Sequence, residues 1–229
     1  MSVQLTWLGH ATWLIQTQQH QIIVDPFLKE NPTASYPVDE VDVGYVLLTH
    51  GHFDHVADAA AIANRCGATL VGSYEVATWF AEKHSVANTL GMNIGGAVGM
   101  PFGRLKMTHA IHSSQLPDGS YGGPAGGYLL EVEGKRIYFA GDTALFSDMQ
   151  LYASDGLDVA ILPIGDLFTM GPEDSVQASQ WLSAGLVLPS HYGTWPPIEQ
   201  DAAAWAKQIR SKTSSRALVP ILNKPVEIT

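Results

Sequence analysis

Short apolar runs, broken by polar and turn-forming residues, recur along the whole chain and predict its elements. Three of these runs lie close together near the start, at residues 3–8, 12–17 and 21–25. The stretches that separate them, residues 9–11 and 18–20, are tight turns in length and composition. We therefore expect three antiparallel strands that form a meander.

Later runs alternate with segments of helical period. After the apolar run Tyr45-Val46-Leu47-Leu48-Thr49, a helical pattern extends from about Asp54 to Asn64. The same reading predicts further strands over residues 68–72, 104–111, 127–134, 136–141, 158–164 and 186–190, and helices over residues 75–84, 172–185 and 200–212.

Turn and capping residues refine these boundaries. Pro172 and the two acidic residues after it favour a helix start, and Gly185 favours the end of that helix. Glu133 and Gly134, with Lys135, favour a hairpin turn. The chain then divides into two similar halves, each with strands before helices, which predicts two packed sheets with helices outside. Because no linker interrupts the pattern, we expect one domain over residues 1–229.

Composition restricts the classes of function. The chain has 12 Lys and Arg against 22 Asp and Glu, a formal net charge of −10, and the basic residues are scattered. Long nucleic acids are therefore not expected as partners, and a small molecule is the expected substrate. Cys66 is the single cysteine, which excludes a disulfide framework and fits a cytoplasmic protein. The first residues resemble a strand more than a signal peptide, and no apolar run is long enough to span a membrane.

Residues that can bind a metal follow five of the predicted strands. They are His50, His112, Asp142, Asp166 and His191. Strand ends on one edge of a sandwich bring residues that are distant in sequence together, and loops on a rigid scaffold are where sites are built. This shared position indicates a site more strongly than any one motif does.

The densest group of such residues is residues 50–55, with the sequence HGHFDH. His50 and His52 can point the same way from an extended backbone. Asp54 and His55, at the start of the next helix, can turn toward a second ion. The glycine between the first two histidines would permit a sharp bend.

Three more distant residues would complete two ligand sets. His112 would complete the first, His191 the second, and Asp142 could bridge them. Imidazole nitrogens and carboxylate oxygens suit zinc, manganese, nickel or iron. The sequence therefore predicts a site for two divalent metal ions.

The segment THGHFDH, residues 49–55, resembles the T-H-x-H-x-D-H signature of the metallo-β-lactamase superfamily. His112, Asp142 within AGDT, and His191 match the remaining ligand positions of that family in order. The resemblance covers nearly the whole chain and implies an α/β fold, a four-layer αββα sandwich. The segments LGHATWLI, LPIGDLFTMGPEDS and PSHYGTWP resemble a group of small metal-dependent hydrolases related to ascorbate-6-phosphate lactonases and, more distantly, to N-acyl-phosphatidylethanolamine phospholipase D. This resemblance implies hydrolysis but names no substrate.

Several of these residues also have a purely structural interpretation. Residues 49–55 could form a histidine-rich surface loop, and Asp142 could be only a turn residue. The third ligand of the first ion could be His109, inside the predicted strand, although His112 lies at its end like the other ligands. His191 could be a buried core histidine, although the residues around it are typical of a loop.

Four further residues complete the predicted site. His10 would act in catalysis, by proton transfer to the leaving group or by substrate binding, or would simply occupy a β-turn. Asp25 is expected to orient residues 49–55, called the metal loop below, through hydrogen bonds. Asp166 and Tyr192 are candidate pocket residues. The glycine-rich residues 114–127 could form a flap over the site or a plain connection.

The predicted chemistry is hydrolysis. Two divalent cations, zinc before manganese, nickel or iron, would lower the pKa of a bridging water, and Asp54 would orient the nucleophile or accept its proton. The substrate would be a small ester, lactone or phosphodiester; a phosphate would need cations, of which Arg104, Lys106 and Arg136 are nearest in sequence. An iron-dependent redox enzyme and a non-enzymatic metal-binding protein are the alternatives. The many large aromatic residues favour a homo-oligomer.

Overall fold

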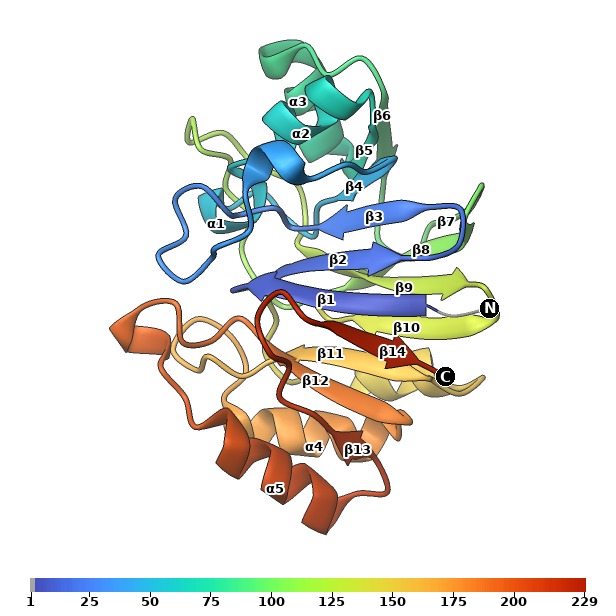
Figure 1. Ribbon diagram of the computed structural model, residues 1–229, viewed down its shortest axis with the longest axis vertical. Coiled ribbons are helices and arrows are strands. Elements are labelled where there is room, and N and C mark those ends of the chain that lie inside the picture. The colour runs from blue at the N-terminus through green and yellow to red at the C-terminus, as the bar shows by residue number, and fades with distance from the viewer. Residues whose placement is uncertain (1–2) are drawn as a thin grey trace.

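Two sheets pack face to face with helices on both outer faces in the computed structural model, which describes residues 3–229 (Figure 1). The first sheet has seven strands, in the spatial order β14 (Pro225–Ile228), β1 (Val3–Gly9), β2 (Thr12–Gln16), β3 (Gln21–Val24), β4 (Tyr45–Leu47), β5 (Thr69–Ser73) and β6 (Thr89–Met92). Strands β1, β2 and β3 pair antiparallel, so the predicted meander is confirmed, and β3 to β6 pair parallel.

The second sheet also has seven strands. Their spatial order is β13 (Arg216–Ala217), β12 (Leu186–Ser190), β11 (Val159–Pro163), β10 (Lys135–Phe139), β9 (Gly126–Val132), β8 (Gly103–His109) and β7 (Ala97–Met100). The hairpin between β9 and β10 turns at Glu133 and Gly134, with φ of 47° and 77°, as the sequence predicts. Two positive φ angles in a two-residue turn match the right-handed twist of the paired strands.

Helices cover the two outer faces, so the expected four-layer αββα sandwich is confirmed. The first sheet carries α1 (Phe53–Val56), α2 (Ala59–Cys66) and α3 (Tyr74–His84), and the second carries α4 (Pro172–Leu182) and α5 (Ala202–Lys212). Three short 3-10 turns, η1 (Val38–Glu40), η2 (Ser147–Ala153) and η3 (Pro196–Ile198), lie in the connections. Within residues 3–229, no helix has the length and apolar character that crossing a membrane requires.

The core lies in three layers of buried side chains. Between the sheets, Leu5 and Leu47 of the first sheet meet Tyr128, Ile137 and Leu188 of the second, all fully buried. Two further clusters lie between each sheet and its helices. Central strands are therefore buried on both faces, which explains why they appear in the sequence as continuous apolar runs.

Some predicted boundaries are wrong. The helix expected from Asp54 to Asn64 is two helices, because the buried carboxylate of Asp58 lies between them and accepts the backbone N–H groups of Leu28 (2.6 Å) and Lys29 (3.0 Å). Helix α4 ends at Leu182 and not at Gly185, since Ser183 adopts the left-handed conformation that ends it.

The strand expected over residues 104–111 ends at His109, so His112 lies in the loop beyond it. The sequence also gave no indication of β6, β7, β13 and β14. All four are edge strands of their sheets.

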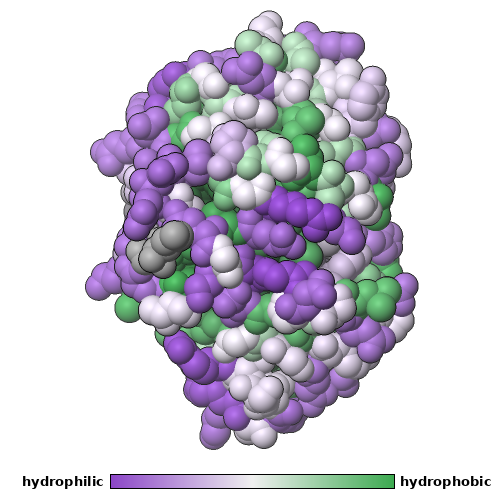
Figure 2. All heavy atoms as spheres, turned by 90° about the vertical axis from the view of Figure 1, so that its right-hand side faces the viewer, coloured by the Kyte–Doolittle hydropathy of each residue, from purple (hydrophilic) through white to green (hydrophobic). Residues whose placement is uncertain are grey.

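One edge of the sandwich collects the carboxyl ends of β4, β10 and β12 and the turn between β1 and β2. It lies on the left in Figure 1, beside α1, and the start of β1 and the end of β14 lie on the opposite side. Figure 2 shows that opposite side, where hydrophilic side chains cover much of the surface and apolar ones form smaller groups between them. The site described below belongs to the first edge.

Candidate metal centre

Three histidine nitrogens converge in the loop after β4. The Nδ1 atom of His52 lies 2.9 Å from Nε2 of His50 and 3.3 Å from Nε2 of His112. The other ring nitrogen of His50 lies 3.0 Å from the hydroxyl of Thr49, which holds the ring so that Nε2 faces the other two histidines. His50 is buried, while His52 and His112 are half-buried.

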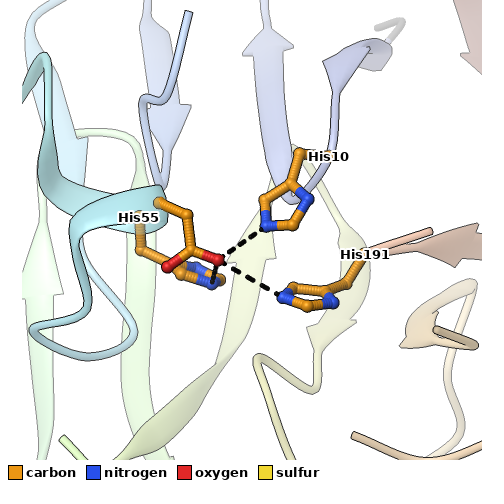
Figure 3. Close-up of side chains that lie close together, drawn as sticks. His10, His55 and His191 are labelled. Carbon is orange, nitrogen blue, oxygen red and sulfur yellow. Dashed lines mark hydrogen bonds and ion pairs between the residues drawn. The ribbon is translucent and has the colours of Figure 1, made fainter. Parts of the chain in front are cut away.

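A second group surrounds the carboxylate of Asp54 at the start of α1. Its Oδ2 atom lies 3.0 Å from Nε2 of His10, 3.7 Å from Nε2 of His191 and 3.9 Å from Nε2 of His55 (Figure 3). The three labelled rings in Figure 3 come from different elements, and all turn a nitrogen toward this one oxygen. All three histidines are buried.

Asp142 joins the two groups. Its Oδ2 atom lies 3.0 Å from Nε2 of His191 and 3.3 Å from Nε2 of His55, both of the second group. The same oxygen lies 3.7 Å from Nε2 of His112, which belongs to the first group. The loop after β10 therefore places one buried carboxylate between both sets of nitrogens.

Asp25 holds the rings of His50 and His55 in place through hydrogen bonds. One of its carboxylate oxygens accepts the backbone N–H of Thr49 at 2.8 Å, and the other accepts the Thr49 hydroxyl at 2.6 Å and lies 2.9 Å from Nδ1 of His55. Asp25 thereby orients one ring of each group without reaching the cluster itself, a common role for a carboxylate behind a metal ligand.

Three residues of the site have left-handed backbone conformations. The φ angles of His10, Asp25 and His191 are 53°, 47° and 52°. This region is unfavourable for residues other than glycine and persists only where the surrounding structure enforces it. The strain therefore falls on the turns that aim these side chains at the cluster.

Burial and mutual charge decide which of these groups carries a proton. Burial, followed by the charge of His55, lowers the pKa of His50 well below its ordinary value. Burial is the largest influence on His55 and His191 and opposes charge on both, but the neighbouring carboxylates, Asp142 first, together outweigh it. The pKa of His55 is raised well above its ordinary value, and that of His191 is raised to about 9. Burial would raise the pKa of Asp142, yet His191 and His55 hold it well below its usual range.

The donor set fits divalent metal ions. Within residues 3–229, the buried Nε2 of His55 makes no hydrogen bond, although it faces Asp142. Such an unpaired buried nitrogen is unfavourable unless another partner is present. Five histidine nitrogens and two carboxylates in two adjoining groups are borderline and hard ligands that suit zinc or another first-row divalent ion. His50, His52 and His112 could hold one ion, Asp54, His55 and His191 another, and Asp142 lies within reach of both.

A cavity of about 650 Å³ opens directly onto the cluster. Its wall includes five of the candidate ligands, namely His52, Asp54, His112, Asp142 and His191, together with Phe53, Ser113, Gln115, Leu116, Pro117, Gly119, Phe168 and Trp195. The volume is within the range of small-molecule binding sites.

Residues 4–191 match the family model described as the beta-lactamase superfamily domain. The chain belongs to the metallo-β-lactamase superfamily. A metal-dependent hydrolase of Thermus thermophilus is 48% identical over 219 residues, which cover 95% of this chain and 96% of that relative. A metal-dependent hydrolase of an Exiguobacterium species is 44% identical over 214 residues, covering 92% and 95%. The solved structure of Igni18, described as a novel metallo hydrolase of the archaeon Ignicoccus hospitalis, matches with a TM-score of 0.89 at 29% identity, over 100% of this chain and 99% of that one.

In this metallo-β-lactamase-type chain, the seven residues predicted as metal ligands all lie in the two adjoining groups described above. The structure also separates the two candidates for the third ligand of the first group. His112 lies against His52, whereas His109 is exposed and packs edge-on against Phe146, with 5.4 Å between the ring centres. His112 is therefore the residue that the first group contains.

Two predicted pocket residues lie elsewhere. Asp166 is exposed in the turn after β11 and does not line the cavity. Tyr192 stacks on Trp7, with ring planes 5° apart and ring centres 5.2 Å apart. It belongs to the hydrophobic core between the second sheet and helices α4 and α5. Burial raises the pKa of Tyr192 to about 12, so this hydroxyl stays protonated.

The role expected for Gly51 also needs correction. Its φ is not positive, so a sharp left-handed bend is not what requires glycine. A Cβ atom at this position would instead lie 3.2 Å from the side chain of Leu116 and 3.4 Å from the backbone of Gln115. Glycine is needed because the loop of residues 114–127 passes directly over the metal loop.

That glycine-rich loop is fastened on both sides. The Ser114 hydroxyl accepts the backbone N–H of Gly51 at 3.0 Å, and the indole of Trp79 on α3 donates to Asp118 at 2.7 Å. Ser73 also donates to the carbonyl of Gly122 at 2.7 Å. The loop therefore forms a wall of the cavity that is attached to the metal loop and to α3.

Reasoning from the sequence missed the residues that support or line the site without binding metal. Thr194, Phe53, Phe168 and Trp195 are the main examples. Phe53 stands between two predicted ligands, and the other three follow the ends of β11 and β12 within a few residues. For Phe53 and Trp195 the available signal was an aromatic residue within a few positions of a predicted ligand; Phe168 and Thr194 had none.

Proposed function

We propose that the protein hydrolyses a small ester, lactone or phosphodiester with the help of two divalent cations, for which zinc is the best fit. It is a metal-dependent hydrolase in the sense in which its relatives are named. The observation that carries the proposal is the position of Asp142, whose single oxygen lies within 3.7 Å of nitrogens from both ligand groups at the mouth of a cavity. Paired cations held here would make water a nucleophile at neutral pH and polarise the bond to be cleaved.

The hydrogen bonds around His10 determine its tautomer. Asp54 is ionised: burial would raise its pKa, but His55 and the hydrogen bonds from His10 and His191 hold it far below its ordinary range. An ionised carboxylate can only accept, so Nε2 of His10 must carry the proton that it shares with Asp54. Burial, followed by the charge of His191, lowers the pKa of His10 to about 4, so the ring is neutral and Nδ1 accepts from the Thr194 hydroxyl at 2.8 Å.

His10 therefore supports the reaction in a different way from the proton donor that the sequence suggested. It is fully buried, it does not line the cavity, and both of its ring nitrogens are already engaged. Its role is to position Asp54. The leaving group has no direct path to this imidazole.

Asp54 lines the cavity and is the better candidate to orient the attacking water. Because its pKa lies far below neutral, it is a poor final acceptor of a proton. It can accept a hydrogen bond from water and thereby align the oxygen for attack. His10 on the other side keeps the carboxylate in place.

Two alternatives use the same ligands. Nitrogen and carboxylate ligands also suit iron, which would favour redox chemistry, and a non-enzymatic metal-binding protein needs no cavity. The cavity beside the cluster favours an enzyme. A cytoplasmic location, a small-molecule substrate without nucleic-acid or membrane partners, and assembly into a homo-oligomer remain part of the proposal.

The test compares His112→Ala with His109→Ala, two histidines three residues apart. Metal content per chain, measured by mass spectrometry on protein purified without a chelating tag, should fall from about two ions to about one in His112→Ala. Hydrolysis of activated esters should be lost with it. His109→Ala, which removes an exposed ring outside the cluster, should keep both the metal content and the esterase activity. Predominant iron in the purified protein, or full activity of His112→Ala, would contradict the proposal.

A further inference from the structure

The cavity beside the metal cluster has apolar walls. Phe53 and Phe168 leave 53% and 57% of their surface exposed, although both are large and apolar. Leu116, Pro117 and Trp195 line the same space. Large apolar side chains gathered at the mouth of a cavity indicate that an apolar group binds there.

One wall is an aromatic cluster with a fixed geometry. The fully buried ring of Phe27 packs edge-on against Phe53 at 5.7 Å and lies 5.8 Å from Trp195, measured between ring centres. Trp195 in turn packs edge-on against His10 at 5.1 Å. The exposed faces of Phe53 and Trp195 are therefore held in place before any ligand arrives, which reduces the entropy lost on binding.

The facing wall is carried by a strained turn after β11. Asp166 and Leu167 have φ of 61° and 26°, and the backbone N–H of Thr169 donates to the carbonyl of Asp166 at 2.7 Å. The N–H of Met170 donates to the carbonyl of Thr143 at 2.8 Å, next to Asp142. Backbone strain of this kind is maintained mainly where a site requires it. The turn holds Phe168 at the cavity and couples it to the metal cluster.

Among the described residues that line this cavity, the metal ligands aside, no side chain is cationic. None of the described residues that line it is Lys or Arg, and its uncharged polar residues are Ser113 and Gln115. Arg104 and Arg136, two of the cations expected to bind a phosphate, lie 3.6 and 3.8 Å from Glu131, at the starts of β8 and β10 on the opposite edge. That edge faces the viewer in Figure 2. The net charge of −10 also disfavours the approach of anions.

We propose, on the basis of the hydrolase function above, that this cavity selects an uncharged ester or lactone bearing an apolar group about the size of an aromatic ring. Substrates that carry a carboxylate or a phosphate on that apolar group are disfavoured, because the apolar wall offers no partner for the charge. In the reaction the bond between the acyl carbon and the leaving oxygen breaks and water forms the new carbon–oxygen bond. Its protons go to the leaving oxygen and to solvent, and no electrons are transferred.

The first experiment compares two esters with the same leaving group on the zinc-loaded protein. These are 4-nitrophenyl butyrate, which is neutral, and 4-nitrophenyl hydrogen succinate, which carries a carboxylate at the end of a similar chain. We expect kcat/KM to be at least about tenfold higher for the butyrate, since a buried charge without a partner is strongly disfavoured. Equal or faster hydrolysis of the succinate would overturn the selectivity.

A pair of variants in the strained turn tests the apolar wall. Phe168→Ala should raise KM for 4-nitrophenyl phenylacetate by about tenfold with little change in kcat, because it removes contact with the apolar group and leaves the reacting atoms alone. Leu167→Ala is the matched control, since it removes an exposed apolar side chain from the same turn that does not line the cavity. An unchanged KM in Phe168→Ala, or an equal effect of Leu167→Ala, would remove Phe168 from the binding site.

Adding a cation provides the converse test. Gln115→Arg should raise the ratio of kcat/KM for the succinate ester to kcat/KM for the butyrate ester by about tenfold. An unchanged ratio would count against the selectivity. If zinc-loaded protein cleaves neither ester, the proposed function fails, and the selectivity is then measured by calorimetric binding. Tighter binding of 4-nitrophenyl butyrate than of 4-nitrophenyl hydrogen succinate supports it, and the reverse order overturns it.

Discussion

A buried chain of hydrogen bonds, from Thr194 through His10 to Asp54, controls one side of the metal cluster. Each link has a direction that follows from the charge of its neighbour: the carboxylate accepts, so the imidazole donates to it and accepts from the hydroxyl. A residue that never reaches the substrate can therefore still determine where a ligand oxygen lies.

Removing the outermost link should weaken the site. In Thr194→Val, the buried Nδ1 of His10 loses its hydrogen-bond donor, so the ring is held less firmly against Asp54, and zinc affinity should fall by about tenfold. Isothermal titration with zinc measures the change. The control is the same substitution in a His10→Ala background, where it should have little further effect. Full additivity of the two substitutions would show that Thr194 does not act through His10.

Zinc binding should depend on pH in a defined direction. In the metal-free protein His55 and His191 hold protons, because the pKa of His55 is raised well above its ordinary value and that of His191 is raised to about 9. A metal ion must displace these protons, so zinc affinity should increase as pH rises from neutral to about 9, by about tenfold per pH unit for each proton displaced. Calorimetry in buffers of different ionisation enthalpy counts the protons released. An affinity that does not change over this range would contradict the assigned charges.

At the scale of elements, the glycines near the two ends of β10, Gly134 and Gly141, are required for different reasons. Gly141, directly before Asp142, has φ of 65°, and a Cβ there would lie 2.5 Å from the carbonyl oxygen of Gly126. Gly134 in the β9–β10 turn has φ of 77° but no atom within 4 Å of such a Cβ. Gly141 is required because of its left-handed conformation and because a side chain there would clash. Gly134 is required because of its conformation alone.

This difference predicts two separable outcomes. Gly134→Ala should lower the free energy of unfolding by about 1–2 kcal/mol, the penalty of a left-handed residue with a side chain. Gly141→Ala should lower it by more and should also reduce zinc bound per chain, because β10 must shift against β9 and carry Asp142 with it. Thermal unfolding and metal analysis of the two variants measure both effects. Equal stability and full metal content in Gly141→Ala would contradict the close approach.

Central elements could be predicted from the sequence, and edge elements could not. Strands β1 to β5 and β9 to β12 are largely buried, so they stand out as apolar runs, whereas β6, β7, β13 and β14 are short edge strands with weak apolar character. Edge strands are often short for this reason. The same contrast holds at the site. Ligand residues such as His50 follow buried strands and could be placed, but Phe168 depends on a turn whose conformation has no sequence signature.

At the scale of the whole molecule, the metal cluster joins the two halves of the sandwich. The loop after β4 and α1 supply ligands from the first half, and His112, Asp142 and His191 come from the second. The large aromatic residues that favoured an oligomer are largely accounted for within one chain, since Trp13 and Trp205 are fully buried and Trp195 lines the cavity. The oligomeric state stays a prediction, to be measured by light scattering.

Metal should therefore stabilise the fold as well as support activity. With free zinc about a hundredfold above its dissociation constant, binding adds about 2.7 kcal/mol to the free energy of unfolding. For a domain of this length, removing zinc with a chelator should lower Tm by about 5 to 10 °C in calorimetry. The Asp142→Ala variant should show a much smaller difference between the two conditions. An identical Tm with and without chelator in the unaltered protein would mean that the cluster does not bind metal.

The pairing of β14 with β1 brings residues 3 and 228 side by side. During synthesis β1 emerges long before β14, and its outer edge stays unpaired until residues 225–228 have left the ribosome. An open strand edge can pair with other chains and promote aggregation. Contacts this distant in sequence also slow folding. Nascent protein therefore passes through a vulnerable interval, and chaperone demand or aggregation during expression should depend on how quickly this last strand docks.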